Sequence, residues 1–260
     1  MRYSRLIPSL FAAALAVCAP ATQANPHETT LANGLRVIVK EDRRAPTAVH
    51  MVWYRAGGMD EKNGTTGVAH LLEHMMFKGT PTTGAGEFSR LVAAAGGRDN
   101  AFTSRDYTAY FQQIPKEKLA DMMALEADRM RHLTVDAKEF AQEIKVVMEE
   151  RRMRTDDNPR AVLGEQQRAV TFIASPYRRP VIGWMGDLEA LTAHDAREFY
   201  KTWYTPANAA VVVVGDVDPQ QVLALAKQHD IRLEAFNQAQ CLFAISGGGF
   251  QQCMTTKRAN

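Results

Sequence analysis

The sequence has little cysteine, no excess of charge of either sign and, after its first residues, no long apolar run. Three cysteines in 260 residues are too few for a disulfide scaffold. Lys and Arg (31) nearly balance Asp and Glu (29), which argues against binding to nucleic acid or to an anionic membrane. These features also exclude a multi-span membrane protein. What is present, 46% hydrophobic and 23% charged residues, is typical of a globular protein with a sizeable core.

The first 24 residues have the three-part pattern of a secretory signal peptide. Arg2 and Arg5 form a basic start, residues 6–19 are mostly apolar, and small residues allow cleavage after Ala21 or Ala24. The apolar run is too short to span a bilayer comfortably. We therefore expect an exported protein, either periplasmic or secreted.

Cys18 offers an alternative reading of the same segment, a lipid anchor. Val17 is bulkier than the small residue that normally precedes a lipidated cysteine, which argues against this alternative. Removal of residues 1–24 takes away Arg2 and Arg5 and changes the formal charge from +2 to 0. The mature chain has no further membrane-spanning candidate.

Apolar periodicity and turn residues predict the secondary structure of the mature chain. Strands are expected within 31–40, 48–54, 100–103, 107–113 and 209–214, and helices at 68–77, 87–95, 116–133, 137–154, 161–173, 193–203 and 219–228. Strands and helices mix without strict alternation, which predicts an α+β fold with a mostly antiparallel sheet packed against helices. We expect one domain over residues 25–230, followed by an atypical tail at 231–260.

The most informative segment is His70-Leu71-Leu72-Glu73-His74. On a helix these three polar residues project from one face, so two imidazoles can bind one Zn²⁺ while Glu73 reaches the same site without being a ligand. This is the inverted order of a known catalytic zinc motif, in which the carboxylate is the general base. The alternative is two hydrogen-bonded core histidines with a surface glutamate. Burying three such groups without a metal is costly, so the segment favours one zinc ion per chain.

A catalytic zinc site usually has a third protein ligand, and the helix predicted at 137–154 offers Glu143, Glu149 and Glu150. The helix carries an apolar stripe of Phe140, Ile144, Val147 and Met148. Glu149 lies nearly opposite this stripe and should face solvent. Glu150 lies at the edge of the apolar stripe, two turns from Glu143, so these two residues can face a shared site. We expect Glu150 to be the ligand and Glu143 to orient a histidine or the base.

Several blocks of the sequence together resemble the pitrilysin/insulinase family of zinc peptidases, which includes the mitochondrial processing peptidase. The matching segments are 57–61, 67–80, 100–104, 143–159, 183–184, 204–208 and 211–216. The resemblance covers about residues 28–230, which is the first domain of such proteins. It implies the family fold, the metalloenzyme LuxS/peptidase-like domain.

The resemblance also implies roles for individual residues. His70, His74 and Glu150 are similar to the zinc ligands, Glu73 to the catalytic base that activates water, and Glu143 to the assisting catalytic carboxylate. The implied activity is that of a zinc-dependent endopeptidase acting on a peptide or small protein.

Four further residues are similar to substrate-binding positions. Asn100 and Ala101 would lie on a strand edge where the peptide adds as an extra strand. Phe77 and Phe102 resemble residues that line pockets beside the scissile bond, with plain core packing as the alternative for both. Tyr110 is expected to be structural.

The chain departs from the family pattern in one respect. Active members commonly carry a second, similar domain that closes over the substrate, within the chain or on a partner subunit, and no second copy is evident here. The chain thus resembles the catalytic half of a two-domain clamshell, which a second family subunit would complete. Two alternatives remain: a non-catalytic subunit with a binding or assembly role, and a fragment without stable function. Cys241 and Cys253 in the tail are either disulfide-bonded or free.

Overall fold

A computed structural model describes residues 25–229 of the chain. The expected signal peptide at 1–24, the lipid-anchor alternative at Cys18 and the atypical tail at 231–260 lie outside the described residues.

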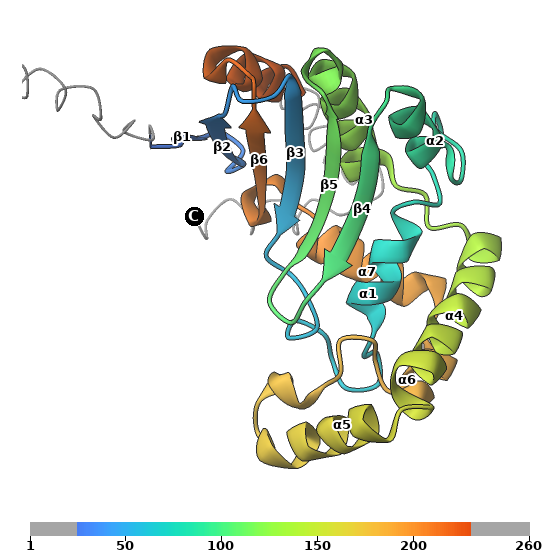
Figure 1. Cartoon of the computed structure of the whole chain (residues 1–260). Helices are drawn as coiled ribbons and strands as arrows, with labels where there is room; N and C mark the ends of the chain where they lie inside the picture. The colour runs from blue at the N-terminus through green and yellow to red at the C-terminus, as the bar shows by residue number, and fades with distance from the viewer. Residues whose placement is uncertain (1–24, 230–260) are drawn as a thin grey trace, which may run out of the picture.

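Within the described residues, one sheet of six strands organises the fold (Figure 1). The strands are β1 (His27–Thr30), β2 (Arg36–Glu41), β3 (Thr47–Tyr54), β4 (Arg98–Thr103), β5 (Thr108–Pro115) and β6 (Ala209–Gly215). Their order across the sheet is β1-β2-β6-β3-β5-β4. Only β2 and β6 pair in parallel, and the other neighbours are antiparallel. The expected α+β fold with a mostly antiparallel sheet is confirmed.

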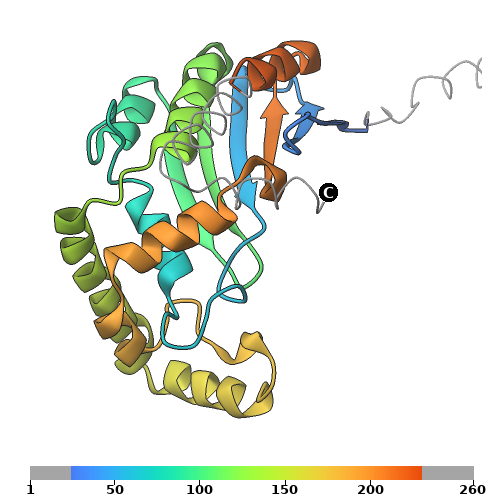
Figure 2. The same ribbon diagram turned by 180° about the vertical axis from the view of Figure 1, so that it is seen from behind.

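Helices cover one face of this sheet. The helices α3 (Leu119–His132) and α7 (Ala193–Trp203) lie in front of the strands in Figure 2 and behind them in Figure 1. The pattern of β3 follows from this arrangement, because its side chains alternate between buried and half-buried along the strand. The buried positions of this strand are Ala48, His50, Val52 and Tyr54. A period of two therefore places one set of side chains against the helices.

The remaining helices agree with the sequence prediction to within a few residues, with one addition. They are α1 (Val68–Met75), α2 (Glu87–Ala94), α4 (Ala137–Arg151), α5 (Pro159–Thr171) and α6 (Met185–Ala190), and residues 219–229 are also helical. The six-residue α6 was not expected from the sequence. The chain leaves α4 through a π-helical turn at Arg152–Asp156. None of the helices in the described part combines the length and apolarity needed to cross a bilayer.

Close packing and a buried carboxylate fix the start of α1. The backbone of Gly67 has φ 89°, and a Cβ there would lie 2.7 Å from the carbonyl oxygen of Ile182. Glycine is therefore required by conformation and by space. The Glu61 carboxylate accepts hydrogen bonds from the backbone N–H groups of Gly67 (3.0 Å) and Ala69 (2.9 Å). Glu61 thus satisfies free donors at the helix N-terminus, the task of a capping side chain.

Candidate metal centre and active site

Three side chains from two helices bring ligand atoms together. The Oε2 atom of Glu150 on α4 lies 3.6 Å from Nε2 of His70 and 3.5 Å from Nε2 of His74, both on α1. One ligand atom from each residue lies within 4.8 Å of the others. The two histidines are one helical turn apart, and their ring centroids are 4.7 Å apart at 76°. The structure therefore brings together all three residues that the sequence singled out as metal ligands.

The three side chains fit a zinc ion. Zinc bonds of 2.0–2.2 Å in a tetrahedral site place ligand atoms about 3.3–3.6 Å from one another. Glu150 Oε2 is buried and accepts no hydrogen bond within residues 25–229, although it faces two ring nitrogens. An unpaired buried carboxylate oxygen is costly, and a cation between these three atoms removes that cost.

The imidazole of His70 is held in its neutral form, which is the form that binds metal. Burial, with the proximity of His74 and of the Arg154 guanidinium adding to it, lowers the pKa of His70 to about 3. Its Nδ1 atom is buried and has no hydrogen-bond partner among the described residues.

The other histidine is oriented by a carboxylate. Nδ1 of His74 lies 2.8 Å from Oε1 of Glu143. Because a carboxylate accepts, the proton belongs on Nδ1, which leaves the Nε2 lone pair facing Glu150. Nζ of Lys78 lies 2.5 Å from the second oxygen of Glu143. Burial alone would raise the pKa of Glu143, but Lys78 and His74 outweigh it and hold the pKa below its usual value.

Glu73 is held on the same face of α1 by a residue from the sheet. Its Oε2 atom accepts a short hydrogen bond from the Thr103 hydroxyl at the end of β4. Burial raises the pKa of Glu73, and the hydrogen bond from Thr103 opposes part of that rise. A carboxylate with a raised pKa is suited to general base and acid chemistry near neutral pH.

A cavity of about 530 Å³ opens above these residues. Its lining consists of His70, Glu73, His74, Asn100, Ala101, Phe102, Thr103, Glu150, Arg154, Thr155, Val181 and Ile182. Three of the four expected substrate-binding residues lie here on β4, the last strand in the sheet order. Among the described residues no strand pairs with the outer edge of β4, so an extended peptide could add there.

Phe77, the fourth expected substrate-binding residue, does not line this cavity. Its ring packs against Phe88 (6.3 Å between centroids) and Tyr110 (6.2 Å), and the Arg129 guanidinium lies 4.9 Å from its centroid. This placement favours the core-packing alternative for Phe77. Tyr110 is fully buried, consistent with a structural role.

The site also contains three residues that the sequence alone did not single out: Thr103, Arg154 and Thr155. Thr103 was part of a matching block, but its contact with Glu73 was not foreseen. The alternation of β4 gives a signal, because it places Thr103 on the same face as Ala101. Arg154 and Thr155 gave no such signal, because they lie in the π-helical turn after α4.

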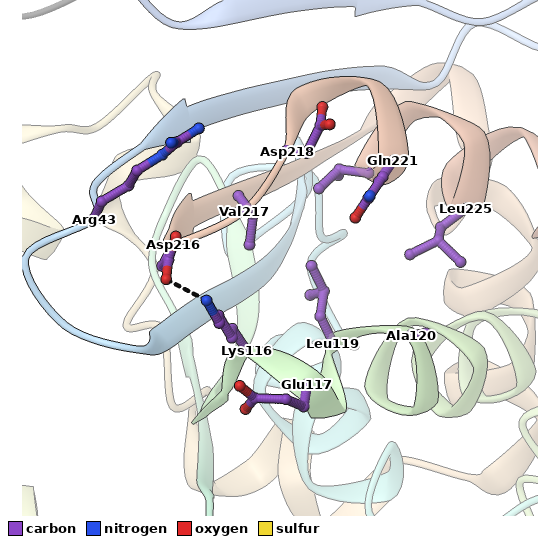
Figure 3. A pocket seen from close by; sticks show the side chains of 11 residues that line it. Arg43, Lys116, Glu117, Leu119, Ala120, Asp216, Val217, Asp218, Gln221 and Leu225 are labelled. Atoms are coloured by element: carbon purple, nitrogen blue, oxygen red, sulfur yellow. Dashed lines mark hydrogen bonds and ion pairs between the residues drawn. The ribbon is translucent and has the colours of Figure 1, made fainter.

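A second cavity of about 530 Å³ lies on another part of the molecule (Figure 3). It lies between the start of α3 and the segment that follows β6, and none of the predicted site residues lines it. Two of its charges pair with each other, because Nζ of Lys116 lies 2.5 Å from Oδ2 of Asp216. The residues singled out from the sequence therefore gather at the cavity above His70 and His74 and not at this one.

The sequence and the fold of this chain are similar to those of known families and proteins. The family model described as Insulinase (Peptidase family M16) matches residues 36–183, and the Peptidase M16 inactive domain matches residues 190–243. Zinc protease PqqE of Helicobacter pylori is 40% identical over 205 residues, which cover 78% of this chain and 46% of that protein. The chain spans about half the length of the curated relatives it matches.

Solved structures agree with this similarity. The crystal structure of a protease from Helicobacter pylori superimposes with a TM-score of 0.77 at 38% identity, covering 79% of this chain and 50% of that one. The periplasmic protease PqqL from Escherichia coli gives a TM-score of 0.73 at 28% identity, covering 79% and 23%.

Proposed function

The chain belongs to the insulinase family of peptidases, family M16, and from this we propose that it is the metal-binding half of an exported zinc endopeptidase. The observation that carries the proposal is the approach of Glu150 Oε2 to both imidazole Nε2 atoms, with Glu73 on the same helix face. The signal-peptide pattern supports export to the periplasm or beyond.

His70, His74 and Glu150 would hold the zinc ion, one per chain. When bound, zinc supplies a Lewis acid that polarises a carbonyl oxygen and lowers the pKa of water. Glu143 keeps His74 in the tautomer that ligates, and Lys78 in turn holds Glu143.

Glu73 would move the proton during hydrolysis. Thr103 occupies its Oε2 atom, so Oε1 is the oxygen that accepts a proton from the attacking water. Glu73 then returns this proton to the leaving amine, so peptide and water give a carboxylic acid and an amine. Burial keeps the carboxylate partly desolvated, which strengthens its basicity.

Peptide or small-protein substrates would bind along β4. Backbone groups at its outer edge offer main-chain hydrogen bonds to an extended chain. Asn100, Ala101 and Phe102 line the cavity from this strand, which supports a role for them beside the scissile bond. A second family subunit or domain would close the opposite side.

The proposal is tested with the full chain, a quenched fluorogenic peptide mixture and a chelator. We expect about one zinc per chain and hydrolysis that stops with the chelator. Glu73→Gln should keep zinc and lose turnover. A wild-type chain that binds no zinc, or full activity in Glu73→Gln, would overturn the proposal. Zinc without hydrolysis would favour the alternative of a binding or assembly subunit, which size measurement and partner capture would then examine.

A further inference from the structure

A third cavity, of about 420 Å³, adjoins the active-site cavity. Thr155 and Val181 line both cavities, so they share a wall. Three arginines line the third cavity: Arg105, Arg168 and Arg178. We call it the arginine cavity.

These arginines have no carboxylate partners in the described part of the chain. None of the three forms an ion pair there, and Arg178 only reaches the carbonyl oxygen of Ile173 at 3.4 Å. The Nε atom of Arg105 is buried without a hydrogen-bond partner. Burial, and then the nearby Arg168, lowers the pKa of Arg105. A partly desolvated cation beside a second cation is stabilised when an anion joins them.

The neighbouring carboxylates are already engaged elsewhere. Glu165 lines the arginine cavity but accepts two hydrogen bonds of 2.9 Å from Arg151. Asp106 accepts a hydrogen bond from the Tyr177 hydroxyl, and its attraction for Arg105 is not an ion pair within 4.0 Å. The lining of the cavity therefore has an excess of positive charge. It also offers guanidinium groups without a carboxylate partner, whose paired N–H groups suit a carboxylate.

The arginine cavity lies on the path of a peptide that pairs with the edge of β4 and continues beyond the end of that strand. Arg105 comes two residues after Thr103, in the turn between β4 and β5. Figure 1 shows α5, which carries Arg168, at the same end of the sheet as that turn. A peptide that follows the edge of β4 past Glu73 meets the shared wall and then the arginines.

We propose that the arginine cavity binds an acidic side chain of the peptide substrate, so that the site selects Asp or Glu at one position beside the scissile bond. This selection rests on the proposed peptidase function. The binding of a carboxylate in the cavity does not depend on that function, so carboxylate binding and peptide selection can be measured separately.

The first experiment measures carboxylate binding in the full chain with N-acetylglutamate amide and its uncharged analogue N-acetylglutamine amide. We expect the glutamate probe to bind at least about tenfold more tightly, which is the preference that one charge-assisted hydrogen bond confers. It should also shift the Arg105 Nε–H resonance. Arg168→Gln should reduce the preference to about twofold or less, and Arg105→Gln should do the same.

Arg160→Gln is the matched control, because Arg160 is an exposed arginine on α5 that does not line the cavity. It should leave the preference unchanged. Arg168 is itself exposed, so its variant stays folded even if the partly buried Arg105 cannot be replaced. Equal binding of both probes, or a preference that survives Arg168→Gln, would overturn the site.

The second experiment tests selection with Glu73→Gln, which should bind peptides without cleaving them. A set of labelled octapeptides carries one Glu or one Gln at each position in turn. We expect a Glu preference at one or two adjacent positions that Arg168→Gln abolishes. If the glutamate probe binds but no position prefers Glu, selection is refuted. If acidic peptides bind but the wild-type chain cleaves none of them, the peptidase function fails and the arginine cavity stands.

Discussion

Glu149 and Glu150 are neighbours on α4, yet only the carboxylate of Glu150 faces the two imidazoles. The side chain of Glu149 is 59% exposed and pairs with Arg152 at 2.9 Å. The side chain of Glu150 is 15% exposed and faces the two imidazoles. A difference of one residue on a helix is a rotation of about 100°, which separates a solvent-facing carboxylate from an inward-facing one.

This pair gives a matched test of the third ligand. Glu150→Ala should lose zinc, because one of three protein ligands and its charge are removed. Glu149→Ala should keep about one zinc per chain, because its carboxylate points to solvent. Elemental analysis after dialysis against a weak chelator measures both. Zinc retained by Glu150→Ala and lost by Glu149→Ala would reverse the ligand assignment.

The hydrogen bond from His74 to Glu143 predicts a smaller effect on the metal. Glu143→Gln should weaken zinc binding by about 10- to 100-fold, the usual result of losing a residue that orients a ligand. Competition with a fluorescent chelator measures the affinity. Glu139→Gln, one turn earlier on α4, is the control and should bind zinc as the wild type does. An unchanged affinity in Glu143→Gln would show that His74 needs no orienting partner.

The Thr103 hydroxyl predicts a pH effect on hydrolysis. Thr103→Val removes the hydrogen bond that lowers the pKa of Glu73, so that pKa should rise. The base is then protonated at higher pH, and the acid limb of the pH–rate profile should move upward. The maximal rate should fall by about tenfold or more, the effect of losing a hydrogen bond to a charged group.

Thr103→Ser is the control for this change, because it keeps the hydroxyl and loses only a methyl group. Its profile should stay close to that of the wild type. If Val and Ser at this position give the same profile, the hydroxyl does not act on Glu73.

A buried histidine away from the site predicts how stability depends on pH. Nδ1 of His50 lies 2.7 Å from Oε1 of Gln112, whose amide donates to Glu126. Burial lowers the pKa of His50, against the attraction of Glu126 and with the repulsion of Arg129. The pKa of His50 in the unfolded chain, about 6.5, is therefore higher than in the folded chain, and between the two values the unfolded chain binds a proton that the folded chain does not.

The free energy of unfolding should consequently fall as the pH drops below 6.5, by about 1.4 kcal/mol per pH unit from this group. His50→Gln should flatten the dependence by that slope, as measured by urea unfolding at several pH values. His194→Gln, at an exposed position on α7, should not. Identical slopes for the wild type and His50→Gln would contradict the assignment.

Local helix geometry explains which parts of the site could be predicted from the sequence. The spacing of His70, Glu73 and His74 places them on one helix face whatever the rest of the fold is. The apolar stripe of α4 similarly sets which way Glu149 and Glu150 point, because the stripe must face the core.

The remaining contacts depend on packing between distant elements. Thr103 reaches Glu73 across 30 positions of sequence only because the end of β4 packs on α1. The arginine cavity combines a turn after β4 with α5 and the loop beyond it, and no local period encodes that meeting. The short α6 escaped prediction because six residues hold fewer than two helical turns.

The π-helical turn that follows α4 comes shortly after the expected metal ligand Glu150 and carries two residues that line the cavity. Its wider winding is visible in the hydrogen bond from the Asp157 N–H to the Arg152 carbonyl, five residues back. Glu150 lies before this turn, while Arg154 and Thr155 lie in it and line the cavity above the two histidines, and Nη1 of Arg154 lies 2.7 Å from Oε1 of Glu150. Gaining or losing one residue in this turn would redirect both side chains and remove the contact of Arg154 with Glu150, so under the proposed function the turn would couple the shape of the cavity to the metal ligand.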